Sequence, residues 1–327
     1  MPAIGFQEKY CIGVWSQKTF EMRQCIAFIS LFLVLSGHVY AETEEVFREI
    51  KSQTVTVRFE RGLGRTAEEI LQSIPSIRSE LERKLGLSAD FSIVIVLYKN
   101  SKNFKKISRT DMISAFAIPE QRLIVIDDSK TLRHPLDIKL IVMHEMCHLV
   151  LSHHIPRSNL PKWLNEGISQ WISGGAGEII SPASTNSLKM AFISKNVLPF
   201  SGLSRTFPSD RNSFILSYEQ SKSIVEYIEE TYGDGSVQSI ISRLASGSEF
   251  DEAIGEELSV NFRTLEHEWK EKMTLKYTWV TYLSNNIYWI LFITGALLTV
   301  FAFIKLRKRI RDYKDDDEDD YYDPDLE

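Results

Sequence analysis

The chain has 327 residues, of which 43% are hydrophobic and 25% are charged, a composition typical of folded domains and not of disordered or collagen-like chains. Its net charge of −6 is concentrated at the C-terminus, where residues 312–327 contain ten acidic side chains and one lysine. The rest of the chain is nearly neutral, so we expect no nucleic-acid partner.

The N-terminal residues have the layout of a secretory signal peptide. A basic residue after Met22 is followed by the apolar run Ile26–Leu35 and by a more polar stretch that ends at Ala41. This run is shorter than the roughly 20 residues that a helix needs to span a bilayer. We therefore expect residues 1–41 to be an N-terminal extension and signal peptide that starts at Met22 and is cleaved after Ala41. The alternative is a buried N-terminal helix of the fold.

Residues 42–281 are predicted to form an extracytoplasmic α+β domain. Its first half alternates β-type and helical hydrophobic spacing, and its second half is mainly helical, with loops rich in Gly, Ser and Pro. The predicted strands are Thr54–Phe59, Phe91–Leu97 and Arg122–Ile126, and the predicted helices are Thr66–Leu85, Ile138–His153, Phe214–Tyr232, Val237–Ala245, Phe250–Leu258 and Phe262–Met273.

The predicted helix Ile138–His153 contains the pattern H-E-x-x-H, as His144-Glu145-Met-Cys-His148. Residues four apart lie on the same face of a helix, so both imidazoles can bind one ion. Glu145 projects beside that ion and could take a proton from a bound water. The pattern therefore predicts a catalytic zinc site.

A catalytic zinc site needs a third protein ligand, and Glu166 is the candidate. It follows His148 by eighteen residues, after turn signals that allow a second helix to fold back. His153 and His154 leave the metal-facing side of the helix, and we expect them to be exposed at its end. Cys147 points about 100° away from His148, so we interpret it as a core thiol and not as a fourth ligand.

A second apolar run, Ile287–Ile304, is long enough to be a transmembrane helix. A basic cluster follows it between residues 305 and 314, which predicts that the C-terminal side is cytoplasmic. A buried core helix is the alternative interpretation of the run. Residues 305–327 would form a basic and then acidic cytoplasmic tail, which is either an interaction segment or simply a solvated, disordered end.

The motif H-E-M-C-H, followed by W-L-N-E-G, resembles the gluzincin clan of metallopeptidases and specifically the peptidase MA-like domain proteins. The resemblance covers about Thr54 to Trp269 and implies a zincin-like fold, with a small mixed sheet and an active-site helix before a mainly helical half. It implies that zinc is bound by His144, His148 and Glu166 and that Glu145 is the general base.

The resemblance also implies a substrate-binding edge strand before the zinc helix, for which Arg122–Ile126 is the expected segment. Thermolysin-like relatives have an aspartate four residues after the third ligand, where this chain has Gln170, whose amide can accept from an imidazole N–H but supplies no charge. Tyr218 is a candidate donor to the oxyanion of the reaction. Its spacing with Val225 and Ile228 fits a half-buried core aromatic equally well.

These features together predict a single-pass membrane zinc metallopeptidase of the cytoplasmic membrane that acts on peptides or proteins. The alternative is a zinc-binding, catalytically weak ectodomain that serves as an envelope scaffold or assembly factor. The sequence does not indicate the substrate, endo- or exopeptidase action, or the oligomeric state.

Overall fold

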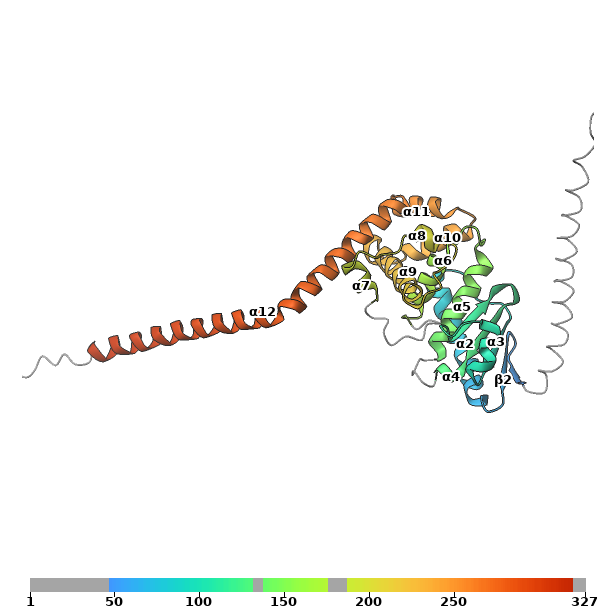
Figure 1. Cartoon of the computed structure of the whole chain (residues 1–327), viewed down its shortest axis with the longest axis horizontal. Coiled ribbons are helices and arrows are strands. Elements are labelled where there is room, and N and C mark those ends of the chain that lie inside the picture. Colours follow the sequence, from blue (N-terminus) through green and yellow to red (C-terminus); the bar gives the residue numbers. More distant parts are fainter. Residues whose placement is uncertain (1–46, 132–137, 176–186, 320–327) are drawn as a thin grey trace, which may run out of the picture. The chain divides into compact units, whose positions relative to one another are not determined.

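The computed structural model describes residues 47–131, 138–175 and 187–319 of the chain (Figure 1). The predicted signal peptide lies outside these residues, as does the end of the acidic tail. The chain divides into two units, and the division passes through one helix between Gly167 and Ile168. The first unit contains Met1–Leu160, Ile168–Ile180 and Val237–Ser248, and the second contains Pro161–Gly167, Ser181–Ser236 and Glu249–Glu327.

The first unit is built on a mixed five-stranded sheet in the order β1-β2-β3-β5-β4. Three neighbouring strands are parallel, and the two outer strands pair antiparallel with them. The strands are β1 (Phe47–Lys51), β2 (Val55–Glu60), β3 (Ile93–Tyr98), β4 (Ala115–Ile118) and β5 (Leu123–Asp127). The three predicted strands correspond to β2, β3 and β5 within two residues, whereas β1 and β4 were not predicted.

The prediction that Arg122–Ile126 is the edge strand is wrong, because β5 lies between β3 and β4. In its register Ile124 pairs with Ile95 of β3 on one side and with Ala117 of β4 on the other. Four of its five residues are buried, which is the continuous burial of an interior strand. The edge of the sheet on this side is β4.

Helices α2 (Gly64–Leu85) and α5 (Ile138–His154) pack against each other and against the sheet. The buried side chains of α2 are apolar and recur every three or four residues, from Ala67 to Leu85. Helix α5 contacts β4 and β5, so the sheet supports the helix that carries the H-E-x-x-H motif. The unit also contains α3 (Ser101–Ser108), η1 (Pro119–Gln121), α4 (Asp128–Thr131) and α10 (Ser236–Ala245).

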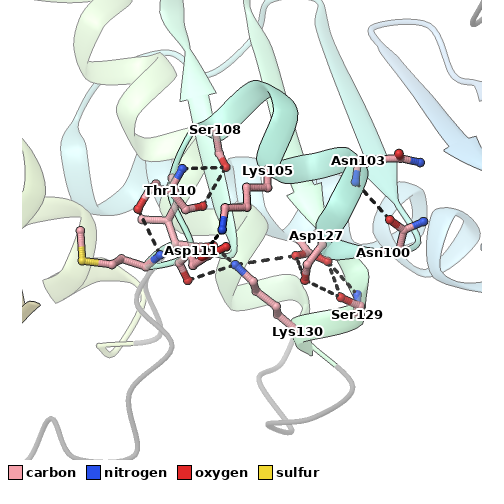
Figure 2. Close-up of polar contacts among 12 residues, drawn as sticks. Asn100, Asn103, Lys105, Ser108, Thr110, Asp111, Asp127, Ser129 and Lys130 are labelled. Carbon is pink, nitrogen blue, oxygen red and sulfur yellow. Dashed lines mark hydrogen bonds and ion pairs between the residues drawn. The ribbon is translucent and has the colours of Figure 1, made fainter.

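Asp127, the last residue of β5, is fully buried and organises the end of this strand (Figure 2). Its carboxylate accepts hydrogen bonds of 2.6 Å from the hydroxyls of Ser101 and Ser129, and the ammonium of Lys130 lies 3.7 Å away. Lys130 also donates to the carbonyl of Ile113 at 2.5 Å, although burial lowers its pKa. The network joins the starts of α3 and α4 to the sheet. Within it, the positive charge of Lys130 compensates the negative charge of the buried Asp127 carboxylate.

The second unit is helical and is centred on aromatic side chains. Its helices are α7 (Ser187–Ile193), α8 (Phe200–Leu203), α9 (Arg211–Tyr232), α11 (Phe250–Leu258), α12 (Phe262–Asp319) and the first residues of α6 (Lys162–Ile172). The indole of Trp163 is fully buried and lies 4.8 to 5.6 Å, between ring centroids, from the rings of Phe200, Phe262 and Phe250. The indole N–H of Trp269 donates to Ser223 at 3.1 Å.

Helix α12 is one continuous helix of 58 residues, drawn from orange to red in Figure 1. The predicted helix Phe262–Met273 and the predicted transmembrane run are therefore parts of the same element. Its segment Asn286–Arg311 is long and apolar enough to cross a membrane. The most apolar 18-residue window has a mean hydropathy of 2.3, and none of it is buried within the chain.

Candidate metal centre

Helix α5 places the H-E-x-x-H residues inside the protein. Every residue from Ile141 to Leu151 is buried, and His144 and Glu145 have no exposed surface. Such burial disfavours ionised and polar side chains unless they meet partners or a bound ion. The helical spacing of four residues brings the two rings together, with their centroids 4.8 Å apart.

The donor atoms of His144, His148 and Glu166 converge on one point. The two imidazole Nε2 atoms are 3.1 Å apart, and one donor atom from each of the three buried residues lies within 4.8 Å of the others. A tetrahedral zinc with Zn–N bonds of 2.0–2.1 Å holds two nitrogens about 3.3 Å apart. The set therefore fits zinc, and two imidazoles with one carboxylate leave the fourth position of a catalytic site open.

Helix α6 carries Glu166. The position of this part of α6 within the second unit is explained by two residues that flank Glu166, Trp163 and Gly167. Trp163 anchors the start of α6 in the aromatic core. Gly167 lies directly against α9, since a Cβ atom added there would be 2.4 Å from the carbonyl oxygen of Ser221. Only glycine permits this approach of the two backbones, and the ligand Glu166 precedes it in the chain.

Two serines, which the sequence analysis did not identify, face the imidazole nitrogens that point away from the centre. The hydroxyl oxygen of Ser173 lies 3.4 Å from Nδ1 of His144, and that of Ser169 lies 3.3 Å from Nδ1 of His148. Both serines are fully buried. Gln170 stands at the position where thermolysin-like relatives have an aspartate, and it is buried on the same helix.

A positive charge lies next to the predicted carboxylate ligand. The ammonium of Lys162 is 3.6 Å from Oε1 of Glu166 and 5.1 Å from the ring centroid of Phe207. Its side chain is 38% exposed, so solvent screens this charge in part.

Tyr218 lies in α9 within an aromatic cluster of the second unit. Its ring centroid is 5.0 Å from those of Phe207 and Phe214, and only 4% of the residue is exposed. This burial agrees with the interpretation of Tyr218 as a core aromatic, and its role as an oxyanion donor stays a prediction.

The remaining histidines and the cysteine of α5 differ in their burial. Cys147 is fully buried, whereas His153 is exposed at the end of α5, where its ring contacts Phe91. His154 donates from Nε2 to the carbonyl of Ser88 at 2.8 Å. Partial burial and the neighbouring cations lower the pKa of His153, which opposes the positive charge that a helix end favours.

Comparison with known families places this site in context. The model of the peptidase MA superfamily matches residues 79–275, more than half of the chain. The chain belongs to the peptidase MA superfamily. The matched range contains His144, His148 and Glu166. The fold is the α+β zincin-like fold that the resemblance implied. No protein of curated function matches the sequence.

Solved structures with similar folds include one zinc metallopeptidase. Yeast LTA4 hydrolase in complex with Bestatin is 14% identical, with a TM-score of 0.41, and the match covers 70% of this chain and 37% of that one. A mutant M1 zinc metallopeptidase from Deinococcus radiodurans is 11% identical, with a TM-score of 0.39 and coverages of 69% and 49%. A functionally unknown conserved protein from Bacillus anthracis str. Ames is 13% identical, with a TM-score of 0.40 and coverages of 71% and 52%. This chain therefore spans about a third to a half of those structures.

Proposed function

We propose that this peptidase MA superfamily protein is a membrane-anchored zinc metallopeptidase that hydrolyses peptide bonds. The observation that carries the proposal is the convergence of three buried donor residues, His144, His148 and Glu166, next to a buried Glu145. Structural zinc sites usually close the metal with four protein ligands, whereas a His₂Glu set leaves a position for water and substrate.

Each residue has a distinct role in the proposed reaction. When bound, zinc would lower the pKa of a water ligand to about 7 and polarise the scissile carbonyl. Glu145 takes the proton of the attacking water and delivers it to the leaving amine. Tyr218 donates a hydrogen bond to the oxyanion, a role that requires its hydroxyl to reach the substrate from the aromatic cluster.

The edge strand β4 is the proposed binding element for an extended substrate. Among the described strands it pairs with β5 alone, and α5 packs against it. A peptide that added to β4 as a further strand would lie along the unit that contains the two histidines. The substrate is therefore expected to be a peptide or a loop that can become extended.

The exposed apolar part of α12 supports a membrane anchor. In this proposal residues 42–281 form the extracytoplasmic domain, and Ile287–Ile304 cross the cytoplasmic membrane. Tyr288 and Trp289 are exposed at one end of the run, where aromatic side chains favour the membrane interface. The basic cluster at the other end would be cytoplasmic and would be followed by the acidic tail.

The experiment that tests the proposed function uses the full-length chain in detergent, with Glu145→Gln and His148→Ala beside it. We expect one zinc per chain in the wild type and in Glu145→Gln, and peptide cleavage in the wild type alone, because the amide cannot act as a base. His148→Ala should lose both zinc and activity. Zinc binding without cleavage of a broad peptide library would instead favour the scaffold function.

A further inference from the structure

The serine hydroxyls next to the two histidines occupy one face of α6 and its extension. Ser169 and Ser173 follow Glu166 by three and seven residues, so all three lie on the same side of the helix. Both hydroxyls are buried and are within hydrogen-bonding distance of an imidazole Nδ1 atom. In each ring, Nδ1 therefore faces a serine hydroxyl, and Nε2 faces the Nε2 atom of the second histidine.

The proton of the Ser173 hydroxyl is already used within the helix. It is donated to the carbonyl of Ser169 at 2.8 Å, and a hydroxyl has only one proton to give. Toward His144 the Ser173 oxygen can therefore only accept, which places the imidazole proton on Nδ1. The lone pair of His144 is then on Nε2, which lies 3.1 Å from Nε2 of His148.

The same requirement applies to His148. Its Nε2 atom can offer a lone pair to a shared cation only when Nδ1 carries the proton, and the group next to Nδ1 is the Ser169 hydroxyl. In this arrangement Ser169 accepts as well. Two neutral imidazoles whose Nε2 lone pairs converge repel each other in a buried site, and a divalent cation between them removes that repulsion.

We propose that Ser173 and Ser169 are positioning residues that hold His144 and His148 in the Nδ1-protonated form, so that both Nε2 atoms face one metal ion. The inference rests on the proposed function, because it takes that ion to be the zinc of the peptidase site. Metal-binding histidines commonly donate to a carboxylate, which makes the ring a stronger ligand. A neutral hydroxyl fixes the ring's orientation without that added charge.

Zinc affinity of the full-length chain in detergent micelles tests the proposal, measured by competition with a chromophoric chelator. We expect Ser173→Ala and Ser169→Ala each to weaken zinc binding about tenfold or more, since loss of such outer partners typically costs 10–100-fold. Ser173→Thr keeps the hydroxyl and should restore most of the affinity. Ser221→Ala is the matched control, because Ser221 is equally buried and bonds a carbonyl four residues earlier, and its affinity should be unchanged.

Nitrogen-15 spectra of the histidine rings provide a readout that a loss of packing would not mimic. In the zinc-loaded wild type we expect both rings to be protonated at Nδ1, and in Ser173→Ala we expect the signal of His144 to change. Zinc affinities within twofold of the wild type for both alanine variants would overturn the proposal. A wild type that binds no zinc would instead reject the proposed function, so the two failures can be told apart.

Discussion

Helix α5 and the apolar segment Asn286–Arg311 of α12 are both rich in large hydrophobic residues, but their surroundings are opposite. Eleven consecutive residues of α5 are buried within the protein, whereas none of the α12 segment is. In α5 the apolar residues enclose polar ligands in a medium of low dielectric, where their interactions with an ion are strong. In the α12 segment the apolar residues are exposed within the part of the chain that the structure describes, which is compatible with the proposed membrane helix.

The largest expected effect is the difference in stability loss between a leucine-to-alanine substitution in α5 and the same substitution in α12. Leu151→Ala, in α5, removes a fully buried side chain and should lower the free energy of unfolding by about 2–5 kcal/mol. Leu297→Ala, at a residue of α12 that is 64% exposed, should change it by less than about 0.5 kcal/mol in detergent. Chemical denaturation of both full-length variants measures the difference, and similar losses in the two would mean that the α12 segment packs against protein.

A smaller loss of stability is expected from Gly167→Ala, next to the ligand Glu166. The new methyl would overlap the backbone of α9, so α6 must shift at a cost of about 1–3 kcal/mol, and zinc affinity should fall with it. Gly255→Ala is the control, because no atom lies within 4 Å of the added Cβ, and alanine should slightly stabilise α11. Equal thermal stabilities of the two variants would contradict the close approach of α6 and α9.

Lys162→Gln should strengthen zinc binding by about threefold to tenfold, because it removes a positive charge that lies 3.6 Å from Glu166 and repels a divalent cation. The effect is limited by the exposure of the side chain. Lys222→Gln is the control, since Lys222 makes an ion pair with Glu226 at the same spacing in α9. Weaker zinc binding in Lys162→Gln would show that the ammonium orients the carboxylate more than it opposes the metal.

The smallest effect concerns Glu219, whose pKa burial raises to about 7. Its Oε2 atom accepts from the backbone N–H of Leu188 at 2.8 Å. Because the folded-state pKa exceeds the unfolded value near 4.5, the stability that the protonated form gives is complete below about pH 4.5 and is lost as the pH rises through 7. Glu219 is only partly buried, so solvent screens much of this effect, and Glu219→Gln should gain roughly 2–4 °C in melting temperature, relative to the wild type, between pH 4.5 and pH 8. A constant difference across this range would contradict the shift.

The sequence was sufficient to predict what depends on local spacing. His144 and His148 are one helical turn apart, and Glu166 was found from the requirement for a third donor. Ser169 and Ser173 were not identified, although they share the face of α6 that contains Glu166. Their spacing of three and seven residues was the available signal, but small polar side chains at that spacing are common in helices.

The elements that were missed depend on tertiary pairing. Four residues, Ala115–Ile118, form β4 through hydrogen bonds to β5, and so short a segment has no distinctive periodicity of its own. For the same reason β5 was predicted to be the edge strand. The continuity of α12 was also missed, although Leu275, Trp279 and Leu283 recur at helical spacing between the two predicted segments.

X-ray absorption at the zinc edge of the purified full-length chain tests the proposed ligand set most directly. We predict one zinc per chain surrounded by nitrogen and oxygen atoms at about 2.0–2.2 Å, from two imidazoles, one carboxylate and a water. A sulfur atom at about 2.3 Å would mean that a cysteine, such as Cys147 of α5, is a ligand, and this result would contradict the site formed by His144, His148 and Glu166.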